Sequence, residues 1–258
     1  SQYILMHRYF IKLAFQGTNY HGWQIQSEAR SVQEVLNHAL STIFRQNIQV
    51  IGAGRTDAGV HASCFYAHFD MDADPQPDMQ NAIFRLNRFL PHDIAIYAIT
   101  PVKDKSHARF DAISRTYRYQ VTTLKDPFRT AFAYHFFKEP DMDKMNRAAE
   151  IIAEYKDFTS FSKSRTQVKT HICEIYHAGW YKQKHLLCFT VKANRFLRNM
   201  VRAMVGTLLE IGTGKIEVNK LRDILESKNR SAAGYSVPPN GLFLDHIEYP
   251  KDIFLPEE

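Results

Sequence analysis

The order of strand-like and helix-like segments is the feature that most constrains the fold of this chain. In its N-terminal part, alternating and helically spaced apolar residues predict elements in the order strand, helix, strand, strand, helix, strand. Their expected positions are residues 7–15, 31–44, 48–54, 63–70, 78–89 and 93–99. This is the split-βαβ order of a ferredoxin-like unit. The helix at 31–44 carries a capping box, formed by Ser31 and Glu34.

The remainder of the chain follows a similar order loosely, without a repeat at the level of residues. We expect strands and helices at 115–122, 132–137, 141–155 (helix), 172–180, 185–193, 194–211 (helix), 217–227 (helix) and 242–249. A chain of 258 residues can form one large domain or two halves that share a sheet. The best boundary lies in 100–114, which predicts an N-terminal half at 1–105 and a C-terminal half at 106–258.

Composition narrows the class of protein. Hydrophobic residues make up 45% of the chain, enough for a sizeable core, and the net charge of +6 weakly favours a polyanionic partner. The three cysteines form no Cys-x-x-Cys pair and lie in apolar runs, which predicts buried free thiols in a reducing compartment. No apolar run is long enough for a membrane span, no signal peptide is visible and no metal-ligand spacing occurs. We therefore expect a cytoplasmic protein without a metal.

The segment 52–62 surrounds one carboxylate, Asp57, with small residues that let a backbone turn sharply and a ligand approach closely. An ordinary Gly- and Asp-rich turn is the simplest interpretation. A dinucleotide fingerprint fails, because Asp57 stands where the third glycine belongs and the strand-like 64–70 follows instead of a helix. A phosphate-binding Walker loop fails as well, since the chain has no Gly-Lys-Ser/Thr.

The segment from Gly54 to Ala62 resembles the signature of the tRNA pseudouridine synthase A family. Segments resembling the other motifs of this family follow in the same order, at 15–26, 31–36, 110–119, 157–161, 194–202 and 241–244. One departure is Gln16, which stands where an Asp is usual. The resemblance covers nearly the whole chain. It implies an α+β fold, in which two ferredoxin-like α/β halves form a continuous, mainly antiparallel sheet flanked by helices.

The resemblance also implies an activity. The expected protein is an isomerase that acts as a homodimer on the tRNA anticodon stem-loop. It converts uridine to pseudouridine at positions 38 to 40 without a cofactor. Asp57 is then the catalytic carboxylate, acting as a nucleophile or as a base in a glycal-type route, and the sequence leaves both open.

Other residues have roles implied by the same motifs. Arg202 matches an active-site arginine that would hold Asp57 ionised. With Arg195 and Arg198 it would form one basic face of the helix expected at 194–211. Tyr117 matches a tyrosine that lies against the uracil and is implicated in proton transfer at C5.

Leu242 matches an apolar residue that helps to hold the base. Arg55 matches an arginine that fills the space of the flipped nucleotide, which offsets part of the cost of extrusion. Further basic residues are expected to bind the RNA backbone: Lys163, Arg165, Lys169, Arg195, Arg198, Lys228 and Arg230. The polar, basic segment 160–171 is either an RNA-facing loop or an ordinary solvated loop.

Two other functions remain open from the residues alone. The chain could be an RNA-binding module or RNA chaperone without catalysis, although the set of Asp57, Tyr117 and Arg202 argues against it. It could also be a metal-dependent phosphodiesterase that uses Asp57 with Asp70 or Asp72. The absence of clustered carboxylates and histidines in the sequence argues against that hypothesis.

Overall fold

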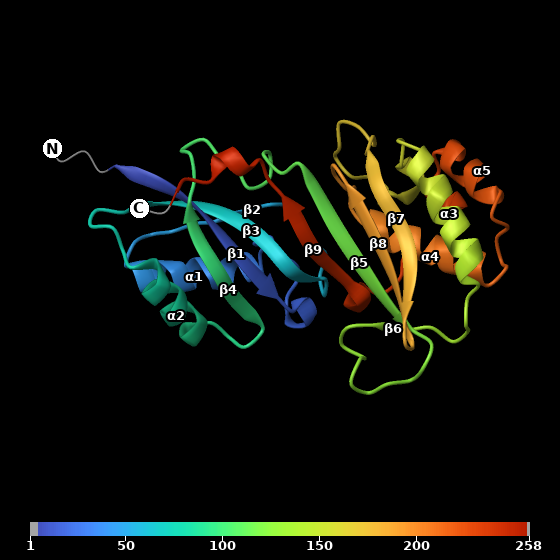
Figure 1. Ribbon diagram of the computed structural model, residues 1–258, viewed down its shortest axis with the longest axis horizontal. Helices are drawn as coiled ribbons and strands as arrows, with labels where there is room; N and C mark the ends of the chain where they lie inside the picture. The colour runs from blue at the N-terminus through green and yellow to red at the C-terminus, as the bar shows by residue number, and fades with distance from the viewer. Residues whose placement is uncertain (1–4, 257–258) are drawn as a thin grey trace. The chain divides into compact units, whose positions relative to one another are not determined.

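The computed structural model describes residues 5–256, and the chain divides into two compact units (Figure 1). The first unit comprises Ser1–Ile113 and Leu244–Glu258, and the second comprises Ser114–Phe243. Each unit combines helices with mainly antiparallel strands, which confirms the α+β class. This grouping differs from the expected halves chiefly at the C-terminal end, where the chain returns to the first unit.

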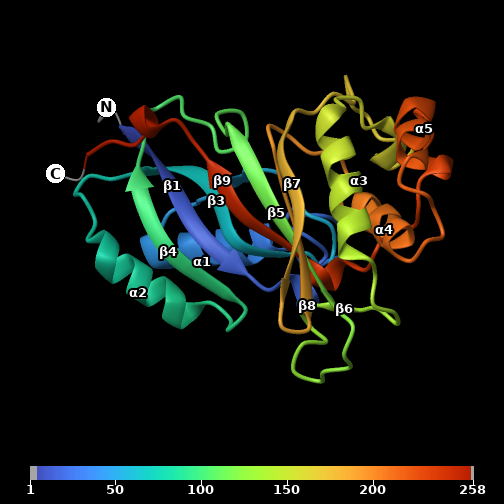
Figure 2. The same cartoon turned by 45° about the vertical axis from the view of Figure 1, so that its right-hand side comes forward.

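In the first unit the strands follow the order β4, β1, β3, β9, with β2 paired to β3. Helices α1 and α2 pack against each other beside this sheet (Figure 2). The elements are β1 (Met6–Phe15), α1 (Val32–Phe44), β2 (Ile51–Gly52), β3 (His61–Asp72), α2 (Met79–Phe89), β4 (Ile94–Pro101) and β9 (Leu242–Glu248). The first two residues of β9 group with the second unit. The expected element order is therefore confirmed for this unit.

Aromatic side chains fill both faces of this sheet. On the face toward α1, the ring of Phe69 lies 5.7 Å from that of Tyr9 and 6.3 Å from that of Phe44. On the opposite face, the ring of Phe10 lies 5.1 Å from Tyr249 and 5.8 Å from Phe254. The C-terminal segment belongs to the first unit because its aromatic residues complete this second core layer.

A buried histidine fastens the segment after β4 to the same face. Nδ1 of His68 accepts a hydrogen bond of 3.0 Å from the backbone N–H of Ala108. The carbonyl of Ala108 in turn accepts one from the hydroxyl of Tyr249. Burial, helped by the positive charge of Arg8 and by His107, lowers the pKa of His68 to about 4. The imidazole is therefore neutral at physiological pH, as its acceptor role requires.

The second unit has the strand order β5, β8, β7, with β6 paired to β5. Figure 1 shows α3, α4 and α5 gathered beside β7 and β8. The bounds are β5 (Ser114–Thr122), β6 (Tyr134–His135), α3 (Met142–Glu154), β7 (Ile175–Gln183), β8 (Leu186–Ala193), α4 (Met200–Gly212) and α5 (Lys220–Ser227). Most of α4 is buried, so it forms the centre of this unit's helical layer.

Each unit covers the free edge of an outer strand with an asparagine. Asn87 of α2 accepts from the N–H of Ile96 in β4 and donates to its carbonyl, at 2.7 and 2.8 Å. Asn146 of α3 makes the same pair of bonds with Trp180 in β7, at 2.7 and 3.3 Å. These amides bind backbone groups that a neighbouring strand would otherwise satisfy.

The prediction of a strand at 48–54 was wrong for most of that range, because only Ile51–Gly52 pairs as a strand, β2. Side chains of α1 bind the backbone before it: Asn37 accepts from the N–H of Val50, and Gln33 donates to its carbonyl. The prediction of buried free thiols is confirmed for all three cysteines. Within residues 5–256, no helix combines the length and apolar character needed to cross a membrane.

Candidate active site

Asp57 lies half-buried in the loop that connects β2 and β3. The backbone N–H of Ala53 donates to the carbonyl of Tyr66 at the mouth of this loop, at 2.9 Å. A tight turn follows, in which the N–H of Val60 donates to the carbonyl of Asp57 at 3.2 Å. The expected arrangement, a carboxylate on a tight turn after a strand, is therefore present.

The N-terminal motif at 15–26 braces this loop directly. The N–H of Gly59 donates to the carbonyl of Tyr20, and the N–H of Trp23 donates to the hydroxyl of Thr56 at 3.1 Å. His61, which is almost fully buried, accepts at Nδ1 from the N–H of Gly17 at 2.9 Å. The two motifs are distant in the sequence, yet each satisfies backbone groups of the other.

Two glycines make this close contact possible. A Cβ atom on Gly17 would lie 2.0 Å from the carbonyl oxygen of Val60, and one on Gly22 would lie 2.2 Å from that of Thr56. Gly22 also has a φ of +80°, which L side chains rarely adopt. The carbonyl groups of Thr56 and Val60, which flank Asp57 in the loop, therefore contact the backbone of Gly22 and Gly17 directly. These contacts fix the position of the loop.

Sequence reasoning missed the positioning residues Thr56 and His61, although both lie in the quoted motif. Their partners are in a separate segment, so only the folded chain shows what they do. Tyr20 anchors that segment by donating its hydroxyl to Asp93 at 2.6 Å, and burial together with this bond raises its pKa. Gln16, the departure from the family pattern, donates to the hydroxyl of Thr18 and gives its 3₁₀ turn no side-chain cap.

Tyr117 lies in β5, half-buried, with its ring in an edge-to-face contact with Phe196 at 4.9 Å. In the same unit, Arg118 lies over the ring of Phe243 at 4.5 Å. Leu242 is buried at the start of β9. Successive side chains of a strand point to opposite faces of the sheet, so Arg118 lies on the face opposite Tyr117. An aromatic ring such as that of Tyr117 and an apolar side chain such as that of Leu242 are of the kind that holds a planar base.

Arg202 lies in the first turn of α4 and is fastened to Val237 at two points. Its Nε donates to the carbonyl of Val237 at 2.9 Å, and its own carbonyl accepts from the N–H of Val237 at 3.1 Å. One edge of the guanidinium is thereby fixed before any ligand arrives. Such a group can orient a carboxylate or a phosphate with little further loss of side-chain entropy.

The helix expected at 194–211 begins only at Met200, because Asn199 adopts a left-handed conformation with φ of 67°. The prediction that Arg195, Arg198 and Arg202 share one helix face was therefore wrong, since Arg195 and Arg198 precede the helix. Arg195 instead donates two bonds to the carbonyls of Thr170 and Ile172, at 3.0 and 2.9 Å. It holds the end of the basic loop at 160–171 in place.

Lys163 and Arg165 lie in this loop and line a pocket of about 350 Å³ within the second unit. The N–H of Lys163 donates to the carbonyl of Arg198, which ties the loop to the segment before α4. Of the other predicted residues, Arg55 is exposed in the Asp57 loop.

The carboxylates proposed as metal partners are engaged elsewhere. Asp70 accepts two bonds from Arg8, at 2.9 and 3.0 Å, and this hydrogen-bonded cation lowers the pKa of Asp70. The carboxylate of Asp72 accepts from the backbone N–H of Asp74 at 3.1 Å. Within residues 5–256, no group of three or more His, Cys, Asp or Glu side chains is placed to hold a metal ion.

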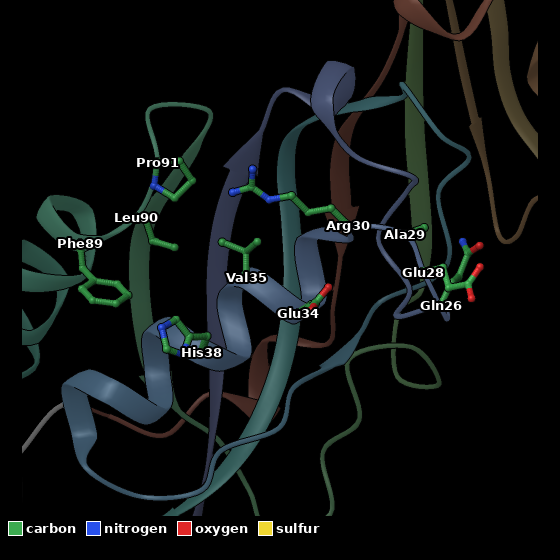
Figure 3. Close-up of a pocket in the computed structure, with 10 residues that line it drawn as sticks. All are labelled: Gln26, Glu28, Ala29, Arg30, Glu34, Val35, His38, Phe89, Leu90 and Pro91. Carbon is green, nitrogen blue, oxygen red and sulfur yellow. The ribbon is translucent and has the colours of Figure 1, made fainter.

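The first unit contains a pocket of about 650 Å³ near the start of α1 and the end of α2. Figure 3 shows Arg30, Val35 and His38 facing Leu90 and Pro91 across it. The guanidinium of Arg30 also lies 5.3 Å from the ring centre of Tyr20. None of the site residues predicted from the sequence lines this pocket.

Comparison with known proteins agrees with this geometry. The profile of a family described as tRNA pseudouridine synthase matches residues 12–111 and 155–250. The chain is 54% identical to tRNA pseudouridine synthase A of Bacteroides fragilis, over 96% of this chain and 98% of that protein. It is 50% identical to the protein of the same name from Porphyromonas gingivalis, over 97% and 100%. For that of Francisella tularensis subsp. novicida the identity is 39%, over 96% of each chain.

Proposed function

The chain belongs to the tRNA pseudouridine synthase family, and from this premise we propose that Asp57 carries out the isomerisation of uridine in tRNA. The proposed targets are positions 38 to 40 of the anticodon stem-loop. One observation carries the proposal: the loop that bears Asp57 is braced by backbone contact with the motif at 15–26. A catalytic carboxylate needs such support, because it must be held close to its productive geometry.

The reaction breaks the bond between N1 and C1′, turns the uracil, and joins C5 to C1′. The hydrogen on C5 is released to solvent, and N1 gains a proton, so the atoms balance without an oxidant or a reductant. Asp57 acts on the nucleotide either by covalent attack or by removing a proton. A half-buried carboxylate on a fixed turn suits both routes, because its position costs no further reorganisation.

Tyr117 and Arg202 assist this step. The ring of Tyr117 is held by Phe196 and stacks on the uracil, while its hydroxyl transfers the proton at C5. Arg202, held by Val237, orients the carboxylate of Asp57. Leu242 gives the base an apolar contact.

Substrate binding falls to the cations. Arg55, at the exposed loop beside Asp57, fills the space left by the flipped nucleotide. Lys163, Arg165 and Arg198 bind the phosphate backbone, and Arg195 holds their loop and adds charge. The enzyme acts as a homodimer, a proposal that rests on the resemblance of the sequence to its family.

The test compares wild type with Asp57→Ala on tRNA transcribed with [5-³H]uridine, since tritium at C5 is released only when the new bond forms. We expect Asp57→Ala to release no tritium above background while its affinity for tRNA stays within about threefold of wild type. Tritium release by the variant would refute the role of Asp57. Binding without release by wild type would identify an RNA-binding module instead.

A further inference from the structure

The pocket of about 350 Å³ in the second unit collects an unusual set of side chains. Its lining carries four side chains that are cations at neutral pH, hydroxyl groups, one imidazole and one amide. The residues are Thr159, Ser162, Lys163, Ser164, Arg165, Thr166, His171, Lys228, Asn229 and Arg230. None of these described lining residues is an Asp or Glu. The pocket thus offers many hydrogen-bond donors and a concentrated positive charge.

Hydrogen bonds between distant segments hold the walls in place. Ser160, fully buried, donates from Oγ to the carbonyl of Ile224 at 2.7 Å and accepts from the N–H of Asn229 at 3.1 Å. The hydroxyl of Thr166 donates to the carbonyl of Lys163 across the turn. Two segments about 70 residues apart are thereby fastened together, so the backbone that bears the cations needs little ordering when an anion enters.

Two of the cations have fixed local partners. Arg230 donates to the carbonyl of Gly234 at 2.8 Å and to the hydroxyl of Ser236 at 3.1 Å, and burial lowers its pKa. Lys228 lies 3.6 Å from Asp157. Burial raises the pKa of Asp157, but the hydrogen bonds from Thr159 and the charge of Lys228 lower it overall. Of the four cations, Lys228 is the one with a carboxylate within ion-pair distance in the described part of the chain, and the lining itself carries an excess of positive charge.

We propose that this pocket is a phosphate-binding subsite, which takes one phosphodiester group of the tRNA backbone. The identity of the RNA rests on the proposed function. The chemistry of the site rests on its own donors, because phosphate oxygens accept several N–H and O–H bonds at once and match lysine and guanidinium groups. A phosphate held here positions the tRNA and adds affinity, but it reads no sequence.

The test compares Lys228→Gln and Arg165→Gln with the control Lys220→Gln, which removes an exposed lysine of α5 outside the pocket. Affinity for an unmodified tRNA is measured across a salt series. We expect each pocket variant to bind roughly tenfold more weakly at low salt. The slope of log K against log salt should become shallower by about one. The control should stay within about twofold of wild type on binding.

Ethylation interference on the whole tRNA locates the phosphate. Ethylation removes the charge of one phosphate at a time, so with wild type the bound position is seen as a site where ethylation prevents binding. We expect that position to vanish from the pattern of Lys228→Gln and to persist with Lys220→Gln. The proposal is overturned if both pocket variants match the control in affinity, salt slope and ethylation pattern.

Measuring tritium release in parallel separates the two proposals. The pocket variants should show a raised KM with kcat within about twofold of wild type, because a backbone phosphate takes no part in the bond changes at the uridine. If the wild type releases no tritium but binds tRNA more tightly than the pocket variants do, the proposed function is refuted and the subsite is supported. If the wild type releases tritium normally and the pocket variants bind tRNA as well as the control does, the subsite is refuted and the proposed function is supported.

Discussion

Gly22→Ala tests whether the N-terminal motif sets the position of the catalytic loop. The substitution adds one methyl group, at a residue far from Asp57 in the sequence. That methyl would lie 2.2 Å from the carbonyl oxygen of Thr56, whereas ordinary contact begins at 3.4 Å. The carbonyl next to Asp57, or the motif itself, must therefore move by about 1 Å.

The expected cost follows from two destabilising terms and one that partly offsets them. A left-handed backbone costs an alanine about 1–2 kcal/mol, and overpacking costs about 1–3 kcal/mol. The lower chain entropy of alanine in the unfolded state returns about 0.4–1 kcal/mol. We therefore expect a loss of roughly 1–4.5 kcal/mol in the free energy of unfolding. A shift of about 1 Å at a catalytic group lowers kcat by roughly a hundredfold.

Urea unfolding and single-turnover tritium release measure the two effects. Gly54→Ala is the matched control, because it lies closer to Asp57 in the sequence but a Cβ there would meet no atom within 4 Å. Its free energy of unfolding should stay within about 0.5 kcal/mol of wild type. If Gly22→Ala is as stable and active as wild type, the bracing of the loop by this motif is not what positions Asp57.

Three further outcomes are expected. Asn146→Ala should lower the free energy of unfolding by about 1–3 kcal/mol in urea, because it strips both bonds from the backbone of Trp180; no loss would mean that water replaces them. The pKa of His68 is 6.5 when unfolded and about 4 when folded, so the unfolded state binds more protons and stability should fall as the pH drops from 6.5 to 4. His68→Asn should flatten that part of the pH–stability profile, and an unchanged profile would place the proton uptake elsewhere. Tyr117→Phe keeps the contact with Phe196 but removes the hydroxyl, so kcat should fall by about 10²-fold with tRNA affinity unchanged, whereas full activity would exclude proton transfer by Tyr117.

Local signals in the sequence predicted most elements correctly. Ser31 caps α1 by accepting from the N–H of Glu34, as the capping box indicates. Asp78 and Asp141 cap α2 and α3 in the same way, which explains why those helices begin where their periodicity starts. These features depend on residues three or four apart, so the sequence contains everything that decides them.

The errors arise where tertiary contact decides the local structure. Val50 reads as part of a strand, but Asn37 and Gln33 of α1 bind its backbone before a strand partner can. The apolar periodicity of 200–211 continues back to 194 in the sequence. The helix nevertheless begins only at Met200, because Asn199 before it adopts a left-handed conformation. Neither the side-chain partner nor the backbone reversal leaves a local pattern.

In the candidate site, too, local features could be predicted from the sequence and tertiary contacts could not. Asp57 could be chosen from the sequence because small residues and a family motif surround it. The hydrogen bonds of Thr56 and His61 to the N-terminal motif could not be chosen, since they join segments more than thirty residues apart. The sequence indicated Lys163, Arg165, Lys228 and Arg230 as cations that bind the RNA backbone. That they line one pocket depends on contacts between 159–171 and 228–230, which no local pattern predicts.

Mapping pseudouridine on an unmodified tRNA that carries uridine at 38, 39 and 40 tests the central claim most directly. After incubation with the protein, cyanoethylation adds mass to each pseudouridine, and mass spectrometry of nuclease fragments locates it. The account predicts label confined to the anticodon stem-loop with wild type and no label with Asp57→Ala. Label outside the stem-loop, or label formed by Asp57→Ala, would contradict it.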